Sequence, residues 1–219
     1  MIQIENVTFT YNGSEEKENL KNISFSIKQG EVILLCGESG CGKTTLTRLI
    51  NGLIPWYYEG EMTGIVKVTG KDIKEQPLHI LSRHIGSVFQ NPRSQFFNVD
   101  TTSEIAFSCE NRGLPETEIQ RRIEQTVSLF HIENLIDRNI FHLSGGEKQK
   151  VACASVSAGE PEIYVLDEPS SNLDVTAIDD LRDIISCWKA AGKTVIVAEH
   201  RLYYLITGGS VPLMEAFLP

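Results

Sequence analysis

The chain has 219 residues, of which 41% are hydrophobic and 22% are charged, an ordinary composition for a globular protein. This length suits one large domain, or a domain with a subdomain, and excludes a string of modules. The 20 basic and 29 acidic residues give a formal net charge of −9, which argues against broad electrostatic binding to nucleic acid or to an anionic membrane surface.

The sequence offers no candidate membrane span and no candidate signal peptide. Its longest apolar runs, such as residues 32–36, are far shorter than the roughly 20 residues of a membrane-spanning helix. The first residues contain no basic region followed by a long apolar core. The five cysteines include no Cys-x-x-Cys pair, so we expect free thiols in a reducing cytosol rather than disulfides or a zinc site.

The N-terminal part is predicted to form β structure followed by a buried strand and a helix. Apolar and polar residues alternate around residues 2–4 and 23–27, which predicts two half-buried strands. Residues 31–36 are apolar without alternation, which predicts a strand buried on both faces. A glycine-rich loop follows, and then a helix. The predicted apolar face of this helix consists of Leu46, Leu49, Ile50 and Leu53.

The rest of the chain alternates between strand and helix patterns. Residues 64–70 are predicted to form a strand, and residues 101–142 are mostly helical, with Pro115 where a helix begins. Residues 163–166 and 194–198 are two more short buried strands. The apolar stripes of the predicted helices are Ile119, Ile123, Val127 and Phe130, and then Ile178, Leu181, Ile184, Ile185 and Trp188.

Apolar strands interleaved with amphipathic helices predict an α/β fold with a largely parallel sheet and an N-terminal antiparallel β part. The helical stretch at roughly residues 91–145 interrupts this alternation. We therefore expect residues 1–219 to form a single domain that carries an inserted helical subdomain.

A phosphate-binding loop is predicted at residues 37–44, which match the pattern G-x-x-x-x-G-K-[ST] between a strand and a helix. Its glycines let backbone N–H groups turn toward phosphate oxygens, and the helix N-terminus adds a partial positive charge. Lys43 would reach the β and γ phosphates, and the Thr44 hydroxyl would ligate Mg²⁺. A chance glycine-rich turn does not explain the strand and helix on either side. The predicted nucleotide-binding residues here are Gly37, Glu38, Ser39, Gly40, Cys41, Gly42, Lys43, Thr44 and Thr45.

Two acidic residues follow the predicted strand at residues 163–166. A carboxylate at the carboxyl end of a strand, beside a phosphate loop, can hold a Mg²⁺ ion, and Asp167 suits that role. Glu168 is then placed to orient or deprotonate an attacking water. The alternative, a pair of solvated acids that open a turn before Pro169, leaves the phosphate loop without a metal ligand from this edge of the sheet.

Residues 143–149, with the sequence LSGGEKQ, carry a family resemblance. Ser144 and Glu147 form a capping-box pattern, which predicts that a helix begins here, and Gly145 and Gly146 leave its first amides open to an anion. The segment resembles the signature sequence of the ATP-binding-cassette (ABC) ATPases. This resemblance implies that Ser144, Gly145 and Gly146 cap the γ-phosphate of an ATP bound by a second subunit.

Other positions extend the resemblance and imply further roles. Gln90 resembles the family's glutamine-loop residue, which contacts Mg²⁺ and the attacking water, and His200 resembles the switch histidine that contacts the γ-phosphate. Asp174 would lie at the dimer interface and also suits an N-cap. Tyr11 resembles the aromatic residue that stacks on adenine, with an ordinary strand aromatic as the alternative. The implied catalytic residues are Glu168, His200, Gln90 and Lys43, and the implied metal ligands are Thr44, Gln90 and Asp167.

Shorter segments resemble the importer ATPases of the energy-coupling-factor type, with a related cobalt-type or general importer ATPase as the alternative. The resemblance implies an ATPase subunit at the cytoplasmic face of the cell membrane. Such a subunit pairs with a second ABC ATPase subunit and powers integral membrane subunits that import a vitamin, a vitamin precursor or a metal ion. The segments are residues 51–55, 58–60, 90–92, 95–97, 104–107, 110–111 and 199–201.

The C-terminal residues depart from the family pattern. After the switch histidine the family normally has another helix, a strand and a short hairpin, but Gly208-Gly209 and Pro212 break any continuous helix here. No closing strand is recognisable. We expect a chain that is naturally truncated, cut short, or one half of a tandem protein.

Aromatic residues near the glutamine loop are candidates for contact with a membrane subunit. Phe96 and Phe97 closely follow Gln90, so they could link the nucleotide state to a docking groove. The alternative for these two residues is a place in the core. A second aromatic cluster, at residues 56–58, is expected to belong to the core.

Two rival functions compete with this interpretation. A nucleic-acid- or ribosome-associated ABC ATPase would need a long coiled coil between Lys43 and Ser144, or a second cassette behind a basic linker, and neither is visible. With the net charge of −9, this predicts no nucleic-acid partner. A P-loop kinase would leave residues 143–149 without a purpose.

Overall fold

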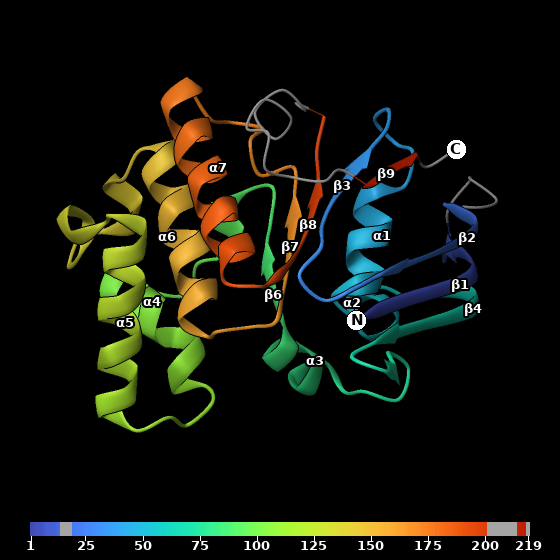
Figure 1. Ribbon diagram of the computed structural model, residues 1–219, viewed down its shortest axis with the longest axis horizontal. Coiled ribbons are helices and arrows are strands. Elements are labelled where there is room, and N and C mark those ends of the chain that lie inside the picture. Colours follow the sequence, from blue (N-terminus) through green and yellow to red (C-terminus); the bar gives the residue numbers. More distant parts are fainter. Residues whose placement is uncertain (14–18, 201–213, 218–219) are drawn as a thin grey trace.

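The computed structural model describes residues 1–13, 19–200 and 214–217 (Figure 1). At its centre lies a five-stranded sheet in which every neighbouring pair of strands is parallel. The strands, in spatial order, are β6 (Ile85–Val88), β7 (Ile163–Asp167), β8 (Thr194–Ala198), β3 (Val32–Cys36) and β9 (Met214–Phe217). The predicted α/β fold with a largely parallel sheet is therefore confirmed.

The edge strand β9 was not expected from the sequence. It pairs in parallel with β3, from Met214 opposite Ile33 to Phe217 opposite Cys36. The expectation that no closing strand is recognisable is therefore wrong. The segment mixes Met, Glu, Ala and Phe and carries little strand preference of its own, so pairing with the edge of the sheet decides its conformation. The predicted helix breaks at residues 208–209 and 212 lie outside the described residues.

A second, antiparallel sheet forms in the N-terminal part of the chain. Its strands, in spatial order, are β2 (Leu20–Ile27), β1 (Ile2–Tyr11), β4 (Gly60–Val68) and β5 (Lys71–Asp72). Ile2 and Ile4 of β1 are buried, as the alternating pattern predicts, because they face the core under this sheet. The predicted strand at residues 64–70 is the second half of β4, which begins earlier, at Gly60.

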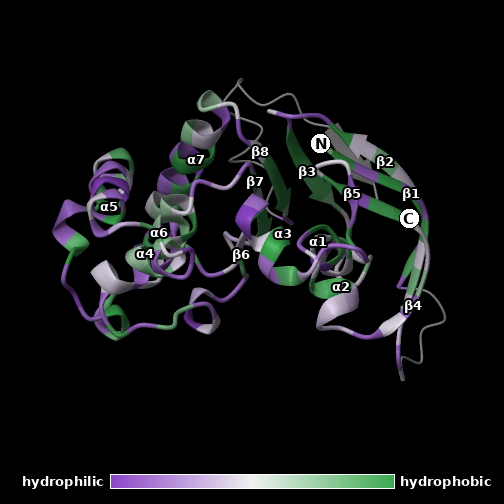
Figure 2. Cartoon of the chain, turned by 90° about the horizontal axis from the view of Figure 1, so that it is seen from below, coloured by the Kyte–Doolittle hydropathy of each residue, from purple (hydrophilic) through white to green (hydrophobic). Residues whose placement is uncertain are grey.

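Helices cover both faces of the parallel sheet. They are α1 (Lys43–Ile50), α2 (Leu53–Trp56), α3 (Leu78–His84), α4 (Thr101–Glu110), α5 (Glu116–Phe130), α6 (Gly145–Ala158) and α7 (Val175–Ala190). Short 3₁₀ turns lie at Pro92–Ser94, Glu133–Leu135 and Ile140–His142. Figures 1 and 2 show α4, α5, α6 and α7 on one side of the sheet, and α1 with the antiparallel sheet on the other. The helix α5 begins directly after Pro115, as predicted.

The strands β3 and β8 are buried on both faces, which explains their continuous apolar sequences (Figure 2). Alternate residues enter two different cores. The core toward α4, α5, α6 and α7 receives Val32, Leu34, Val88, Tyr164, Leu166, Val195 and Val197. The core toward α1 and the antiparallel sheet receives Ile33, Leu35, Ile85, Ile163, Val165, Ile196 and Ala198.

The helix after the glycine-rich loop is shorter than predicted. Gly52 adopts φ +78 and ends α1, so Leu53 belongs to the separate helix α2 and not to the apolar face of α1. This turn also carries the next aromatic residues away from the core. Trp56 is 49% exposed and Tyr57 is 71% exposed, and Tyr58 alone of the three packs against the core. The expectation that residues 56–58 are core is therefore wrong for Trp56 and Tyr57.

The close approach between β6 and α6 depends on a glycine. A Cβ atom at Gly86 would lie 2.2 Å from Val156 Cγ1 of α6 and 2.9 Å from Pro161 Cγ. We expect Gly86→Ala to lower the free energy of unfolding by about 1–3 kcal/mol through overpacking, measured by urea denaturation. Val156→Ala should make room, so the double variant should lose less than the sum of the two single losses. A loss of under about 0.5 kcal/mol for Gly86→Ala would contradict this account.

Candidate functional site

The phosphate loop leaves the end of β3 and enters α1, as predicted. Gly42 in this loop has φ +97 and little free space around it. A Cβ atom there would lie 2.8 Å from both the Asn19 carbonyl oxygen and Leu20 Cδ2, so only glycine fits. The loop residues 38–40 are exposed. The start of β2 therefore packs against one side of the phosphate loop, while residues 38–40 on the other side of the loop are open to a ligand.

The Lys43 side chain lies inside the loop. It is buried, and its Nζ donates to the carbonyl oxygens of Gly37 and Glu38, both at 2.8 Å. A further contact of 3.6 Å joins Nζ to Cys41 Sγ. These contacts hold the ammonium group against the loop whose backbone would cradle phosphates. The predicted role of Lys43 at the β and γ phosphates requires Nζ to exchange these carbonyls for phosphate oxygens.

Thr44 and Asp167 meet across the sheet edge. The Thr44 hydroxyl donates to Asp167 Oδ1 at 3.1 Å, although the two residues are far apart in sequence. Burial raises the pKa of the Asp167 carboxyl, and the Thr44 hydrogen bond partly opposes this shift. A half-buried carboxylate beside a hydroxyl is an oxygen-donor pair of the kind that Mg²⁺ accepts.

The Thr44–Asp167 pair can hold Mg²⁺ only together with further oxygen ligands, such as phosphates and waters. Over residues 1–13, 19–200 and 214–217, no cluster of three or more His, Cys, Asp or Glu side chains could hold a metal ion by itself. Mg²⁺ is commonly held by one or two carboxylates together with substrate phosphates and waters, so a single carboxylate is sufficient here. Gln90, the third predicted ligand, lines the same cavity as Thr44 and Asp167. This donor set fits a Mg²⁺ ion that arrives with a nucleotide.

Two of the predicted catalytic residues, Gln90 and His200, contact the carboxylate of a third, Glu168. Glu168 Oε2 accepts from Gln90 Nε2 at 2.8 Å, and Glu168 Oε1 lies 2.9 Å from His200 Nε2. Gln90, Glu168 and His200 follow β6, β7 and β8, whose carboxyl ends lie side by side. Glu168 has φ +45, a conformation that a non-glycine residue rarely adopts, and its N–H donates to the Ala198 carbonyl at 2.8 Å. The parallel sheet therefore assembles this group from distant parts of the sequence.

The signature segment forms the capping box that its sequence predicts. Ser144 N donates to Glu147 Oε2 at 2.7 Å, and Glu147 N donates to Ser144 Oγ at 3.2 Å. The hydrogen bond from the Ser144 backbone lowers the pKa of the Glu147 carboxyl. A Cβ atom at Gly146 would lie 2.7 Å from Ala177 Cβ of α7, whereas Gly145 has ordinary space. One glycine thus permits the close packing of α6 on α7, and the other leaves the helix start open.

Asp174 lies beside the signature segment. Its Oδ1 accepts from Ala177 N at 2.9 Å and caps α7, as predicted. A cavity of about 330 Å³ is lined by Asp174 together with Ser144, Gly145 and Gly146. No residue of the phosphate loop lines this cavity. The chain therefore carries two separate groups of predicted nucleotide-binding residues, one at the phosphate loop and one at the starts of α6 and α7.

Tyr11 lies at the end of β1, next to the first turn of α1. Its hydroxyl lies 3.3 Å from Thr45 Oγ1 and accepts from Arg48 Nη1 at 3.0 Å. Its ring makes edge contacts with the rings of Phe9 and Tyr58. The hydroxyl contacts place Tyr11 close to the phosphate loop, while the ring packing agrees with an ordinary strand aromatic. Adenine stacking stays a prediction.

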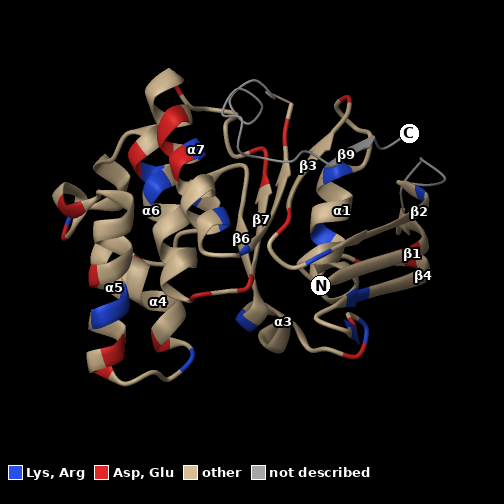
Figure 3. Cartoon of the chain, in the orientation of Figure 1, with Lys and Arg blue, Asp and Glu red and all other residues tan. Residues whose placement is uncertain are grey.

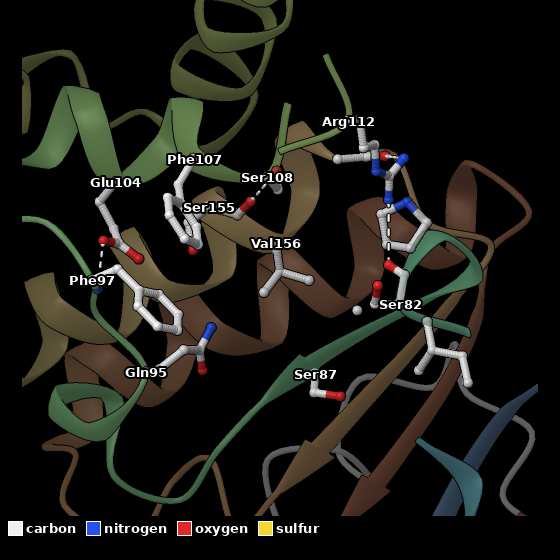
Figure 4. Close-up of a pocket in the computed structure, with 14 residues that line it drawn as sticks. Ser82, Ser87, Gln95, Phe97, Glu104, Phe107, Ser108, Arg112, Ser155 and Val156 are labelled. Carbon is white, nitrogen blue, oxygen red and sulfur yellow. Dashed lines mark hydrogen bonds between the residues drawn. The ribbon is translucent and has the colours of Figure 1, made fainter. Parts of the chain in front are cut away.

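Gln95 and Glu104, which the sequence placed in segments of the family resemblance without a role, fix the loop after Gln90. Gln95 Oε1 accepts from Phe89 N at 3.1 Å. Glu104 is buried in α4, and its Oε2 accepts from Phe97 N at 3.0 Å and Asn98 N at 2.8 Å (Figure 4). An acidic residue in the first turn of a helix was the available signal for Glu104.

Phe97 marks the outer end of this loop. It is 74% exposed and stacks on Phe107 of α4, with ring centroids 4.6 Å apart. A cavity of about 170 Å³ lies between β6, α4 and α6 and has Phe97 and Phe107 in its wall (Figure 4). A larger cavity of about 660 Å³ runs from Thr44 and Asp167 to Tyr57 and Phe97. The predicted metal site and the exposed aromatic residues therefore share one continuous hollow.

Known protein families and sequences include relatives that match most of this chain. A family model described as ABC transporter matches residues 20–171. An ABC transporter ATP-binding protein of Treponema denticola is 54% identical over 206 residues, which are 94% of this chain and 42% of that protein. One from Methanosarcina mazei is 41% identical and covers 92% of this chain and 34% of that protein. The chain spans less than half the length of these curated relatives.

Solved structures of similar fold agree with the sequence relatives. CbiO1 from Clostridium perfringens, described as part of the ABC transporter complex cbiONQ, has a TM-score of 0.80 and 32% identity, covering 92% of this chain and 78% of that one. The ATP-binding cassette MJ0796, in a dimeric post-hydrolysis state bound to ADP and Pi, has a TM-score of 0.80 and 26% identity. That alignment covers 93% of this chain and 90% of MJ0796.

The half-buried Asp167 carboxyl should reduce the stability of the chain without ligands. Its pKa is raised in the folded state, so its ionisation is less favourable there, and stability falls as the pH rises from the unfolded pKa through the folded one. We expect Asp167→Asn to raise the free energy of unfolding at pH 7 by about 1 kcal/mol and to weaken MgATP binding. The stability gain should disappear toward pH 4. A variant that is less stable at pH 7 would contradict this sign.

Proposed function

The chain belongs to the ABC transporter family and carries its ATPase domain, and we propose that it binds MgATP and hydrolyses it to power a membrane transporter. One observation carries the proposal of hydrolysis. The carboxylate of Glu168 is held between Gln90 and His200, at the same sheet edge as the phosphate loop and the Thr44–Asp167 pair. A carboxylate in this position can orient or deprotonate a water that attacks the γ-phosphorus.

The mechanism follows from the contacts of each side chain. The Gln90 amide and the His200 imidazole fix both oxygens of Glu168, so the carboxylate is oriented before water arrives. Glu168 would accept the proton of the attacking water. Lys43 would leave the loop carbonyls for the phosphates and neutralise charge that develops on them. Thr44 and Asp167 would hold the Mg²⁺, whose charge stabilises the phosphate oxygens.

A second ABC ATPase subunit completes the site in this proposal. Ser144, Gly146 and Asp174 lie together but apart from the phosphate loop of the same chain. In a head-to-tail pair, these residues of one subunit would face the ATP on the phosphate loop of the other, and the open amides at the start of α6 would meet the γ-phosphate. The similarity to MJ0796, whose cassette is dimeric in its post-hydrolysis state, supports this arrangement. The partner is either an identical chain or a related one.

The membrane partner would dock along the groove beside Phe97. The larger cavity joins this surface to Thr44 and Asp167, so a docked segment would sense the nucleotide site. None of the helices in the described part of the chain is long and apolar enough to cross a membrane. We place the protein at the cytoplasmic face of the cell membrane, bound to integral membrane subunits. The similarity to CbiO1, part of the ABC transporter complex cbiONQ, supports assembly with transporter subunits. We propose that the transporter imports a metal ion, a vitamin or its precursor.

The nucleic-acid-associated alternative has less support. Figure 3 shows acidic and basic positions interspersed on α5 and α7. On α7, Arg182 pairs with Asp179 at 2.9 Å, and Lys150 of α6 pairs with Asp180 at 2.8 Å. Cations that are paired in this way do not form the basic stripe that binds a phosphate backbone.

Hydrolysis should depend on pairing of chains and on Glu168. If the chain pairs with itself, the total rate of MgATP hydrolysis should rise with the square of protein concentration at low occupancy of the dimer. Glu168→Gln should lower the rate by about a hundredfold while ATP binding is retained. An unchanged rate in Glu168→Gln would contradict the assigned base. Intact ATP binding without hydrolysis at any concentration would contradict pairing with itself.

Phe96 and Phe97 should have different roles, one in the core and one in docking. Phe97 is exposed, whereas Phe96 is partly buried and packs against the core, so Phe97 is the better candidate for docking. We expect Phe97→Ala to reduce co-purification with the membrane subunits by about tenfold, with ATP affinity and unfolding free energy unchanged.

The matched variant Phe96→Ala tests the burial difference. It should lower the free energy of unfolding by about 1–3 kcal/mol because it removes a ring that packs against the core.

If Phe97→Ala co-purifies with the membrane subunits as well as the wild type does, the surface at Phe97 is excluded as the docking surface.

A further inference from the structure

Glu199 is a buried acid at the end of an apolar strand. It directly follows β8, and its side chain is only 2% exposed. Its Oε1 accepts from the backbone N–H of His200 at 2.8 Å, and its Oε2 accepts from the backbone N–H of Ser170 at 3.3 Å. Ser170 lies two residues after Glu168, in the loop that follows β7. The Glu199 carboxylate therefore forms hydrogen bonds with two backbone segments. One is the loop that carries Glu168, and the other is the backbone of His200 itself.

The backbone of the same residue connects this group to the phosphate loop. Glu199 N donates at 3.1 Å to the carbonyl of Leu35, which lies two residues before Gly37. The preceding carbonyl, that of Ala198, accepts from Glu168 N at 2.8 Å. Residues 198 and 199 thus contact the strand that enters the phosphate loop, the loop after β7 and the backbone of His200.

The position of Glu199 matters because Glu168 and His200 come from the ends of two different strands, β7 and β8, and yet contact each other. The 2.9 Å separation of Glu168 Oε1 and His200 Nε2 depends on how far apart the two loops are held. Glu168 also adopts the left-handed conformation, which persists only where the surroundings hold it. Hydrogen bonds from backbone N–H groups to a carboxylate are stronger than neutral ones, and backbone groups do not change rotamer. A buried carboxylate is therefore well suited to fix this separation.

We propose that Glu199 is a positioning residue for ATP hydrolysis, which sets the relative placement of Glu168 and His200 through the Ser170 and His200 amides. This inference rests on the proposed function. It assigns Glu199 no contact with the nucleotide.

The substitution Glu199→Gln tests the proposal with little change of volume. Its amide keeps one acceptor oxygen but turns an NH₂ group toward a backbone N–H, so at least one of the two hydrogen bonds is lost. We expect kcat for MgATP to fall by roughly tenfold or more, with the Kd for ATP within about twofold of the wild-type value. The matched control is Glu162→Gln, an exposed acid just before β7 that pairs with His84 at 3.0 Å. It should leave kcat unchanged.

A double-variant comparison separates positioning from general damage. If Glu199 acts through His200, adding Glu199→Gln to His200→Ala should reduce kcat little further. A kcat for Glu199→Gln within about threefold of wild type would overturn the proposal, as would full additivity with His200→Ala. A parallel loss of kcat, ATP affinity and thermal midpoint would also overturn it, because it indicates general destabilisation.

Amide hydrogen exchange gives a readout that does not need hydrolysis. In Glu199→Gln, the amide of Ser170 or His200 should exchange roughly tenfold faster or more, while amides within β7 and β8 keep their rates. Unchanged exchange at both amides overturns the proposal. If the wild-type chain binds ATP but Glu168→Gln shows no loss of hydrolysis, the proposed function fails instead, and the exchange result still decides the role of Glu199.

Discussion

The parallel pairing of β6, β7, β8 and β3 is the constraint on which the candidate site depends. In this register Leu166 pairs with Val88, and Ala198 pairs with both Asp167 and Leu35. The carboxyl ends of the four strands therefore lie at the same level, and the residues that follow them must meet. Gln90, Glu168, His200 and the phosphate loop share one edge because of backbone hydrogen bonding, before any contact between their side chains is considered.

Burial on both faces makes this edge rigid and also makes its polar groups costly. The sheet has one core toward α4, α5, α6 and α7 and another toward α1 and the antiparallel sheet. Lys43 and Glu199 are almost fully buried at the edge, where an unpartnered charge would be strongly unfavourable. Lys43 is held instead by carbonyls of the phosphate loop, and Glu199 by the backbone N–H groups of Ser170 and His200. The same hydrogen bonds that make these charges tolerable also fix the loops.

Local patterns in the sequence predicted local structure well, and contacts between distant segments account for most of what they missed. The phosphate loop, the capping box at Ser144 and the N-cap at Asp174 each depend on residues only a few positions apart. The strand β9, by contrast, is made by its pairing with β3. The exposure of Trp56 is a local exception, because it follows from the turn at Gly52. Gln95, Glu104 and Glu199 lie in segments that carry the family resemblance, but their hydrogen bonds to backbone N–H groups depend on the path of irregular loops, which the sequence pattern did not predict.

The continuous hollow from Thr44 and Asp167 to Phe97 has a thermodynamic consequence. A molecule that occupies its inner end and one that occupies its outer end contact the same loop, residues 89–98, which Gln95 and Glu104 fasten at both ends. If binding at one end rearranges that loop, the binding free energy at the other end changes as well. The size of this change is the coupling free energy, which is the same for the nucleotide and for the docked segment. If a docked segment at Phe97 raises the affinity for nucleotide by some factor, nucleotide must raise the affinity for that segment by the same factor.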